Sequence, residues 1–409
     1  MHPSNELRGT KSRKLHGKKI VLGVTGSIAA VECVKLIREL VRHGAGVIPV
    51  MTPAAQRIIH PDALEFASGH KPIIQLTGAV EHVAFCGLVA DKADAYLICP
   101  ATANTISKIA YGIDDTPVTT FATTAIGSKI PVIVVPTMHG SMYEHKKVME
   151  NIESLKKSGA VFVQPKLEEN KAKMPEIEEI VENVIRAAGK DAKRLTGKRI
   201  LVIGGATAEP IDDVRVITNL SSGKMGVALA RAAFEMGAYV EFWYGHGTAP
   251  PPKWICTRRF GTVGDLLKLA PECKGFDIIL VCAAISDYTV ERKKGKISSE
   301  TVPEIKLKRA PKVLEALRNA NDFAIIVPFK LESGVDEKEL VRRAVKLLKE
   351  SGSDMAVANT AQTIGADRST VLMVERSGKF VKAKGTKDEM AEKIFDIIAK
   401  GAKKRRKSN

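Results

Sequence analysis

The chain has 409 residues, of which 44% are hydrophobic and 27% are charged, and this composition is typical of a globular protein with two or three domains. No apolar run approaches the roughly 20 residues that a membrane-spanning helix needs. The first 19 residues also lack the apolar core of a secretory signal. We therefore expect a soluble cytoplasmic protein with no membrane partner.

The formal net charge of +17 raises the question of a nucleic-acid partner. Most of the excess falls at the two ends of the chain, and we expect residues 1–16 and 401–409 to form basic, disordered tails. Binding of RNA through residues 403–407 is an alternative, but a solvated tail is the simpler interpretation. The six cysteines form no C-x-x-C pair and no zinc-like spacing, which indicates neither a disulfide framework nor a structural metal.

The first half of the chain alternates short apolar β runs with helical stretches, a pattern that predicts a parallel, doubly wound sheet. The predicted strands span residues 20–24, 46–51, 95–99, 131–135 and 159–163, and the predicted helices span 29–43, 53–68, 103–111 and 176–188. Residues 164–175 are polar, rich in lysine and closed by proline, which predicts a mobile loop or flap. A polar linker follows over residues 189–196.

The pattern then begins again, because residues 197–210 repeat the Gly-Lys-basic lead-in, apolar β run and small-residue turn of residues 17–30. The second set of predicted strands spans 199–203, 239–244, 277–283, 324–329 and 355–359, with helices over 224–236, 263–270, 311–320 and 336–351, a basic loop over 291–299 and a hairpin over 370–381. We therefore expect an α/β protein with two doubly wound, Rossmann-like domains, residues 17–188 and 197–400.

Three polar segments follow predicted strands of the first domain: GVTGSIAA (23–30), PATANTISK (100–108) and PTMHGSM (136–142). The first supplies backbone amides at a helix start and suits one phosphate monoester. The small hydroxyl and amide residues of the second can approach a flat ring system. Since the carboxyl ends of parallel strands meet at one edge, the three segments predict one binding site.

With these segments, residues 17–188 resemble the phosphopantothenoylcysteine decarboxylase family of flavoproteins. The resemblance implies a flavodoxin-like domain that holds FMN between the subunits of a trimer. It assigns the catalytic histidine to His82 and substrate contacts to His139, Met142 and Lys173. The residues it assigns to FMN are Gly26, Ser27, Ile28, Thr52, Pro100, Thr102, Ala103, Asn104 and Thr105.

The implied chemistry suits these residue types. A cysteinyl carboxylate loses CO₂ only when an electron sink stabilises the carbanion, and oxidation of the thiol by a flavin creates one. A histidine that titrates near neutrality is the natural proton acceptor. Two departures from the family stand out: His139 replaces the usual Asn, and the flap lacks the usual proton-donating Cys, for which Lys171 or Lys173 are the candidates. Cys86 lies in an apolar stretch, which predicts a packed core residue.

The second domain carries the most specific string in the chain, EPIDDVR (209–215) followed by ITNLSSGKMG (217–226). Its Ser-Ser-Gly-Lys-Met-Gly run places hydroxyls, a glycine and a lysine where a helix begins. This is the composition of a phosphate cradle, although it lacks the Walker A spacing. We expect the cradle at Ser221, Ser222, Gly223 and Lys224.

Residues 197–400 resemble phosphopantothenate–cysteine ligase, in particular the CTP-using type that is fused behind the decarboxylase. Further matching segments are AAISDY (283–288), GKI (295–297) and DMAVAN (354–359). The resemblance assigns Asn219 to an acyl-cytidylate, Arg215 to the second half-reaction and Lys296 to the nucleotide. The remaining substrate contacts that we expect are Ala283, Asp287, Pro311, Lys312, Val313, Leu314, Phe329, Lys346 and Lys349.

We therefore expect a bifunctional enzyme of coenzyme A biosynthesis. Its second domain would join 4′-phosphopantothenate to cysteine through an acyl-cytidylate made from CTP, with lysines and Mg²⁺ neutralising the phosphoryl charge. Its first domain would decarboxylate the product to 4′-phosphopantetheine. No metal ligand is assigned, and the resemblance implies trimeric flavin domains and dimeric ligase domains that together build a dodecamer. The alternatives are a peptidyl-cysteine decarboxylase or flavin prenyltransferase fused to a nucleotide-binding domain, or a nucleic-acid-binding protein.

Overall fold

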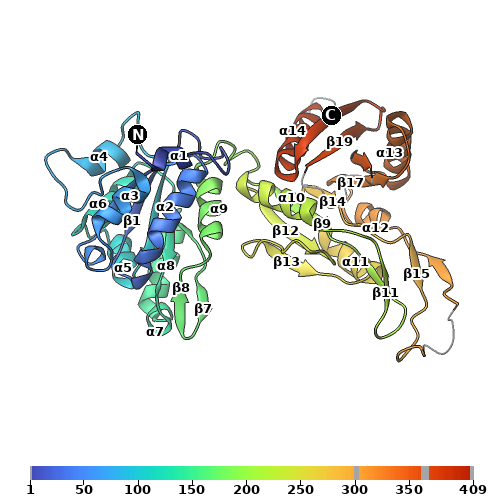
Figure 1. Ribbon diagram of the computed structural model, residues 1–409, viewed down its shortest axis with the longest axis horizontal. Helices are drawn as coiled ribbons and strands as arrows, with labels where there is room; N and C mark the ends of the chain where they lie inside the picture. Colours follow the sequence, from blue (N-terminus) through green and yellow to red (C-terminus); the bar gives the residue numbers. More distant parts are fainter. Residues whose placement is uncertain (1, 299–303, 361–367, 406–409) are drawn as a thin grey trace. The chain divides into compact units, whose positions relative to one another are not determined.

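The computed structural model describes residues 2–298, 304–360 and 368–405. The chain divides into two compact units, Met1–Lys193 and Arg194–Asn409 (Figure 1). The division falls inside the segment 189–196 that the sequence predicts as a linker. Among the described residues, no helix has the length and apolar character that crossing a membrane requires.

The first unit is built on a parallel sheet. Its main strands are β1 (Lys19–Val24), β2 (Gly46–Met51), β3 (Ala95–Ala101), β4 (Val132–Pro136) and β6 (Val161–Phe162). Its helices are α1 (Ser4–Leu7), η1 (Ile28–Glu32), α2 (Cys33–Arg42), η2 (Ala55–Arg57), α3 (Pro61–Ser68), α4 (Glu81–Cys86), α5 (Ala103–Tyr111), α6 (Pro117–Gly127), α7 (Gly140–Tyr143), α8 (Lys146–Lys157) and α9 (Ile177–Ala188). The strand order β2-β1-β3-β4-β6 is flavodoxin-like and reverses direction between β1 and β3.

Helices cover both faces of this sheet (Figure 1). The core on one face contains side chains of α2, α3 and α9, and the core on the other face contains side chains of α4, α5, α6 and α8. Helix α2 shows why: its buried residues Cys33, Leu36, Ile37, Leu40 and Val41 recur at helical spacing and form one apolar stripe. The doubly wound α/β prediction is confirmed for this unit.

The amino-terminal segment is not the disordered tail that the sequence predicted for residues 1–16. Leu15 is fully buried in the core, and its backbone N–H donates to the carbonyl of His43. Arg8 donates to the carbonyl of Ala45 at 3.1 Å, and Lys11 pairs with Glu39. The prediction was wrong because the basic residues of this segment pair with α2 and its following turn instead of remaining solvated.

The second unit contains an eight-stranded sheet in the order β13-β12-β9-β14-β17-β18-β19-β20. Its strands are β9 (Arg199–Gly204), β12 (Tyr239–Tyr244), β13 (Cys256–Arg259), β14 (Ile278–Val281), β17 (Ile325–Glu332), β18 (Met355–Thr360), β19 (Arg368–Glu375) and β20 (Phe380–Thr386). Strands β13 to β18 run parallel, and β19 and β20 are antiparallel additions. The parallel part has the Rossmann order, which reverses between β9 and β14.

Two short hairpins extend from the second unit beyond this sheet (Figure 1). One pairs β10 (Ala208–Pro210) with β11 (Val216–Thr218), and the other pairs β15 (Tyr288–Val290) with β16 (Leu307–Arg309). The sequence did not predict either hairpin, because strands of three residues are too short to show an alternating pattern.

The helices of the second unit are α10 (Lys224–Glu235), α11 (Val263–Leu269), η3 (Ala270–Cys273), α12 (Val313–Ala320), α13 (Glu337–Ser351) and α14 (Lys387–Arg405). Residues of α10 and α14 share one core, those of α11 and α12 share a second, and α13 packs on β18 and β19. The sequence missed α14, whose Met390, Ile394 and Phe395 are buried. Residues 401–405 belong to this helix rather than to a tail, and residues 406–409 lie outside the described residues.

The repeated lead-in forms the same clasp in both units. In the first, Asp94 accepts hydrogen bonds from Lys18 Nζ at 2.9 Å and from the following backbone N–H at 2.8 Å. In the second, Asp277 accepts the matching bonds from Lys198 Nζ at 2.6 Å and from the following N–H at 2.8 Å. Both clasps lie at the amino ends of the strands, opposite the edge where ligands bind in such sheets. The repeated lead-in therefore has a structural role: it ties the start of one strand to the start of its neighbour.

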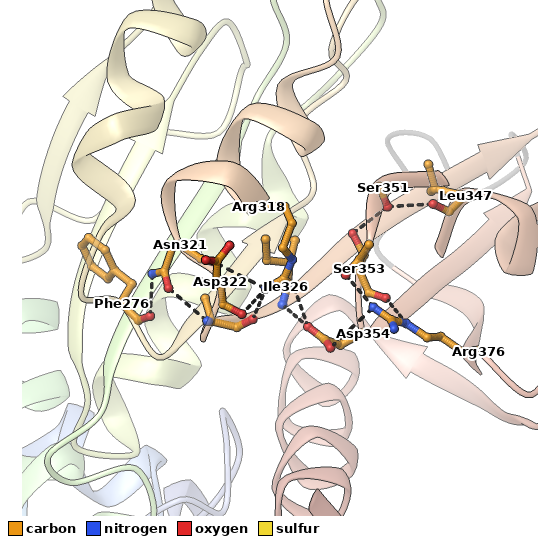
Figure 2. A network of polar contacts seen from close by, with 12 residues as sticks. Phe276, Arg318, Asn321, Asp322, Ile326, Leu347, Ser351, Ser353, Asp354 and Arg376 are labelled. Atoms are coloured by element: carbon orange, nitrogen blue, oxygen red, sulfur yellow. Dashed lines mark hydrogen bonds and ion pairs between the residues drawn. The ribbon is translucent and has the colours of Figure 1, made fainter. Parts of the chain in front are cut away.

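A polar network secures the amino ends of β17 and β18 (Figure 2). The guanidinium of Arg318 donates to three backbone carbonyls of the turn after α12 and to Asp354 Oδ2 at 2.8 Å. Asp354 also accepts from the backbone N–H of Ile326 at 2.9 Å, and Arg376 donates to the carbonyl of Ser353 at 2.7 Å. This network fixes the last turn of α12 against the sheet.

Candidate functional site

The turns that follow β1 and β3 are tied together by one buried hydroxyl. Thr25 Oγ1 donates to the carbonyl of Pro100 at 2.7 Å and accepts from the backbone N–H of Thr102 at 3.1 Å. Thr102 in turn caps α5 by accepting from the N–H of Thr105. Since these turns flank the point where the strand order reverses, they form the crevice in which such folds bind ligands.

The residues predicted to bind the flavin lie along this crevice. Three of them, Gly26, Ser27 and Ile28, follow β1, and Thr52 follows β2. Pro100 lies within β3, and the segment directly after β3 contains Thr102, Ala103, Asn104 and Thr105. A Cβ at Gly26 would lie 2.6 Å from the Cβ of Ala54, so only glycine fits this close approach. The predicted flavin contacts at the ends of β1, β2 and β3 therefore lie along one edge of the sheet.

His82 lies on α4, a helix that the sequence did not predict. Its ring is half-buried, and its Nδ1 atom is buried with no hydrogen-bond partner among the described residues. A buried ring nitrogen without a hydrogen-bond partner lowers the stability of the fold unless a ligand supplies the missing hydrogen bond. This atom therefore fits a site that receives substrate or cofactor. Cys86 is fully buried in the core, as predicted, and this burial raises the pKa of its thiol to about 12.

The predicted mobile flap is an ordered hairpin. Strands β7 (Lys166–Glu168) and β8 (Lys171–Lys173) pair with each other, and β8 also pairs with β5 (Met138–His139), so that His139 stands opposite Lys171. The sequence did not predict these strands, because strands of two or three residues show no alternating pattern and β5 lies about thirty residues from β8. The hairpin places the flap beside the PTMHGSM segment.

The two flap lysines have different surroundings. Lys173 Nζ lies 2.8 Å from Glu169 and 3.7 Å from Glu168, and the hydrogen bond to Glu169 raises the pKa of Lys173. Lys171 is exposed and faces His139 across the strand pair. The predicted substrate contact Lys173 is thus engaged by the glutamates of its own hairpin.

The ring of His139 is fixed at the start of α7. Its Nδ1 accepts from the backbone N–H of Ser141 at 3.4 Å and lies 2.9 Å from Ser141 Oγ. A ring nitrogen that accepts from a backbone N–H carries no proton, so the neutral ring bears its proton on Nε2. Met142, in the same helix, is about half exposed.

The second unit has a corresponding crevice between β9 and β14. Thr207 Oγ1 accepts a hydrogen bond from the N–H of Ser286 at 3.0 Å, and the backbone carbonyl of Thr207 accepts one from Thr218 Oγ1 at 2.7 Å. Asn219 Nδ2 donates to the carbonyl of Ala284 at 3.3 Å. The predicted residues Asn219, Ala283 and Asp287 therefore meet at the point where the Rossmann order reverses.

The predicted phosphate cradle forms the start of α10. Gly223 precedes the helix with φ of +73°, and a Cβ there would lie 2.0 Å from the hydroxyl of Tyr244. Ser221 Oγ accepts from the N–H of Gly223, and Ser222 Oγ from that of Lys224. The helix start thus points its amides and its positive dipole end toward the carboxyl edge of the sheet.

A cavity of about 420 Å³ lies beside α12, β17 and α13. Four residues predicted to contact the nucleotide line it: Asp287, Lys312, Leu314 and Lys346. Sequence reasoning missed three further lining cations, Lys330, Arg342 and Arg343. The predicted contacts that do not line this cavity are Ala283, Pro311, Val313, Phe329 and Lys349. Val313 is a core residue, which explains its position.

The cations of this cavity are paired with carboxylates. Lys312 lies 2.8 Å from Asp287, and Lys330 lies 2.9 Å from Glu332. Burial raises the pKa of Glu332, but hydrogen bonds from Lys330 and Arg343 outweigh it and leave this pKa below its usual value. A polyphosphate that enters the cavity therefore competes with acidic side chains for the same cations.

Arg215 lies in the turn between β10 and β11, Lys296 lies in the segment that follows β15, and neither residue lines the cavity. The guanidinium of Arg215 donates to Asp212 at 2.9 Å and to the carbonyl of Ile297 at 3.2 Å. Lys296 is exposed in the segment that leaves β15. The structure thus joins Arg215 to the lysine segment, a link that neither motif alone indicates.

The donor set fits a flavin and offers no resident metal site. The unpartnered His82 Nδ1, the close approach at Gly26 and the helix start after Thr102 suit a bound flavin phosphate and ring. Among residues 2–298, 304–360 and 368–405, no group of three His, Cys, Asp or Glu side chains is arranged to hold a metal ion.

Comparison with known proteins identifies both units. Residues 8–189 match the family model described as Flavoprotein, and residues 195–402 match the DNA/pantothenate metabolism flavoprotein C-terminal domain. The chain is 46% identical over 405 residues to the coenzyme A biosynthesis bifunctional protein CoaBC of Thermococcus kodakarensis, covering 98% of this chain and 99% of that protein. It is 43% identical over 404 residues to the protein of the same name from Methanocaldococcus jannaschii, covering 98% of each chain.

A solved structure of the DNA/pantothenate metabolism flavoprotein from Streptococcus pneumoniae is 26% identical, with a TM-score of 0.46, and covers 50% of this chain and 99% of that chain. On the family models and the full-length relatives, the chain belongs to the family of bifunctional coenzyme A biosynthesis proteins, with a flavoprotein decarboxylase unit followed by a phosphopantothenate–cysteine ligase unit.

Proposed function

We propose that the second unit uses CTP to join 4′-phosphopantothenate to cysteine, and that the first unit, with FMN bound, decarboxylates the product to 4′-phosphopantetheine. The observation that carries this proposal is the pair of crevices, each at the reversal of strand order and each tied by one buried threonine, Thr25 in the first unit and Thr207 in the second. Support also comes from several residues that the family resemblance assigns to ligands and that lie at these crevices, among them Gly26, Thr102, Asn219 and Ala283.

In the first unit, the amides around Ser27 receive the FMN phosphate, and the segment from Pro100 to Thr105 approaches the ring. Bound FMN supplies the two-electron oxidation of the cysteinyl thiol that makes loss of CO₂ feasible. A ring nitrogen of His82 accepts the proton of the cysteinyl thiol of the substrate. The Nε2–H of His139 donates to the substrate carboxylate, a role that the amide of the usual Asn also serves.

The proton that completes the product must come from a different group here, because the flap has no cysteine. We assign it to Lys171, since it faces His139 while Lys173 is held by Glu168 and Glu169. The Lys171 ammonium would donate one proton to the carbon that lost CO₂ and regain it from water, and the reduced flavin would return its hydride to the carbon that bears the sulfur, which restores oxidised FMN. Lys171→Gln should then slow release of 4′-phosphopantetheine, and Lys173→Gln serves as the comparison.

In the second unit, the triphosphate of CTP occupies the cavity lined by Lys312, Lys330 and Lys346. Mg²⁺ enters with the nucleotide, because Mg²⁺ is commonly held by substrate phosphates with few protein ligands. The pantothenate carboxylate attacks the α-phosphate, pyrophosphate leaves, and Asn219 holds the acyl-cytidylate at the carbonyl of Ala284. The amine of cysteine then displaces CMP, with Arg215 stabilising the departing phosphate charge.

We also propose that the flavin units form trimers, the ligase units form dimers, and the whole chain builds a dodecamer. Beside the flavin crevice Ile28 is 77% and Leu88 is 86% exposed, and on the ligase unit Leu220 is 83% exposed, values that suit surfaces covered by further copies. Light scattering on the whole chain and on each unit tests this assembly. A cytoplasmic location is proposed as well, because the thiol substrate requires a reducing compartment.

The decisive experiment supplies 4′-phosphopantothenate, cysteine and CTP to the purified protein and follows CMP, pyrophosphate and CO₂. The expected result is one CMP per amide formed and one CO₂ per 4′-phosphopantetheine, with flavin absorbance in the purified protein. Substitution of ATP for CTP tests the nucleotide preference. Absence of flavin together with absence of CO₂ would remove the decarboxylase assignment, and absence of pyrophosphate would remove the ligase assignment.

A further inference from the structure

Two consecutive aspartates connect the tips of the two hairpins in the ligase unit. Asp212 and Asp213 lie in the turn between β10 and β11, and they reach the segment of residues 292–297 that follows β15. The sequence places these groups about 80 residues apart, so the connection is a product of the tertiary structure.

The carboxylate of Asp212 is fully buried and is shared between both tips. Its Oδ1 accepts from the backbone N–H groups of Val214 at 2.8 Å and Arg215 at 2.7 Å. Its Oδ2 accepts from Arg215 Nη1 at 2.9 Å and from the N–H of Ile297 at 3.1 Å. Asp212 therefore orients the guanidinium of Arg215 and anchors the residue directly after Lys296.

Asp213 anchors the residue directly before Lys296. Its Oδ2 accepts from the N–H of Gly295 at 3.0 Å, and its Oδ1 accepts from Arg292 Nη2 at 2.8 Å. Its own N–H also donates to the carbonyl of Gly295 at 3.4 Å. Gly295 and Ile297 are thus each held by one aspartate, and none of these bonds uses the side chain of Lys296.

The charges of the lysine segment explain why two carboxylates are needed. The run Arg292-Lys293-Lys294-Gly295-Lys296 places four cations within five residues, and like charges at such spacing repel one another. Together with Arg215, which pairs with Asp212, the joined segments hold five cations, so the two carboxylates offset part of this charge, and the φ of +79° at Gly295 allows the backbone to turn between them. The ammonium group of Lys296 is left exposed and directed by a fixed backbone.

We propose that Asp212 and Asp213 are positioning residues of the ligase reaction. Asp212 positions both Arg215 and Lys296, whereas Asp213 positions Lys296 alone. The inference rests on the proposed function and on the family resemblance, which assigns Lys296 to the nucleotide and Arg215 to the second half-reaction. Loss of Asp212 should then impair both half-reactions, whereas loss of Asp213 should impair only formation of the acyl-cytidylate.

The test measures the half-reactions separately in the full chain. Pyrophosphate release without cysteine reports the first, and CMP release after addition of cysteine to the preformed acyl-cytidylate reports the second. We expect Asp213→Asn to lower kcat of the first about tenfold and to leave the second near the wild-type rate. We expect Asp212→Asn to lower both about tenfold or more. Asp265→Asn is the matched control, because Asp265 also accepts two backbone N–H groups but caps α11.

Two further measurements keep the outcome interpretable if Asp212→Asn folds poorly. Arg292→Gln removes one exposed contact of Asp213 and should slow only the first half-reaction. Backbone hydrogen bonds, led by that from Val214, hold the pKa of Asp212 at about 2 against the effect of burial. Its charge is therefore constant at neutral pH, and the Asp212→Asn defect should be the same from about pH 5.5 to about pH 9.

The proposal and the underlying function fail in different ways. If the wild-type protein releases no pyrophosphate with CTP, the proposed function is wrong. If Lys296→Ala abolishes pyrophosphate release while Asp212→Asn, Asp213→Asn and Arg292→Gln all match Asp265→Asn in both half-reactions, the positioning role is refuted. Equal loss of both half-reactions in Asp213→Asn would refute the difference in scope.

Discussion

Replacement of Thr25 by valine should uncouple the two turns that form the flavin crevice. Valine has nearly the shape of threonine, so the packing of the buried side chain is kept while its hydroxyl is lost. The change leaves the carbonyl of Pro100 and the N–H of Thr102 without their partner in the protein interior. Each such group costs about 1–3 kcal/mol, so we expect the first unit to lose about 2–6 kcal/mol of unfolding free energy.

For a unit of the size of Met1–Lys193, this loss corresponds to a fall in Tm of roughly 4–24 °C. Calorimetry of the full chain measures it, with flavin retention after gel filtration as the functional readout. Thr25→Ser keeps the hydroxyl and removes one methyl group, which is worth about 1 kcal/mol. The reasoning fails if Thr25→Val is no less stable than Thr25→Ser and retains flavin equally well.

The second unit provides the reciprocal control. Thr207 is also fully buried and accepts from the N–H of Ser286, so Thr207→Val should weaken the ligase crevice and leave flavin retention unchanged. Thr25→Val should reduce CO₂ release but not pyrophosphate release, and Thr207→Val should do the opposite. Identical effects of both substitutions on both activities would contradict the assignment of one crevice to each reaction.

Further predictions follow from other sites. His82→Asn should stop CO₂ release while CMP release continues, so that phosphopantothenoylcysteine accumulates; unchanged CO₂ release would exclude His82 as the proton acceptor. Lys330→Met should raise the KM for CTP about tenfold with little change in the KM for 4′-phosphopantothenate, and equal changes in both would place the nucleotide elsewhere. Arg318→Met breaks a largely buried ion pair with an expected loss of about 3–5 kcal/mol in urea unfolding, and a loss under about 1 kcal/mol would refute the importance of the network in Figure 2. At about pH 8, iodoacetamide should modify the exposed Cys256 and spare Cys86, because burial blocks access to Cys86 and raises its pKa to about 12, which keeps the thiol protonated; modification of Cys86 in the native protein would contradict this.

The sequence determined the elements whose signal is local. Strands β2 and β12 and helix α5 have the bounds that apolar patterning predicted, because a strand buried on both faces is a continuous apolar run and α5 has a threonine cap and a closing glycine. The ligand segments were also found in this way, since each follows a strand directly. Family resemblance then named their chemistry, and the comparisons confirm the two enzyme units.

Only the tertiary structure decided the contacts between residues far apart in the chain. It placed Leu15 and its basic neighbours on α2, paired the flap with β5, and brought Lys330 and Arg343 to the cavity beside α12. The physical reason is the same in each case. A charged residue or a strand of three residues leaves no pattern in the neighbouring sequence, and the topology of the chain decides which distant residue it contacts. The joining of Asp212 to the Lys296 segment is the clearest example, because neither hairpin reveals it alone.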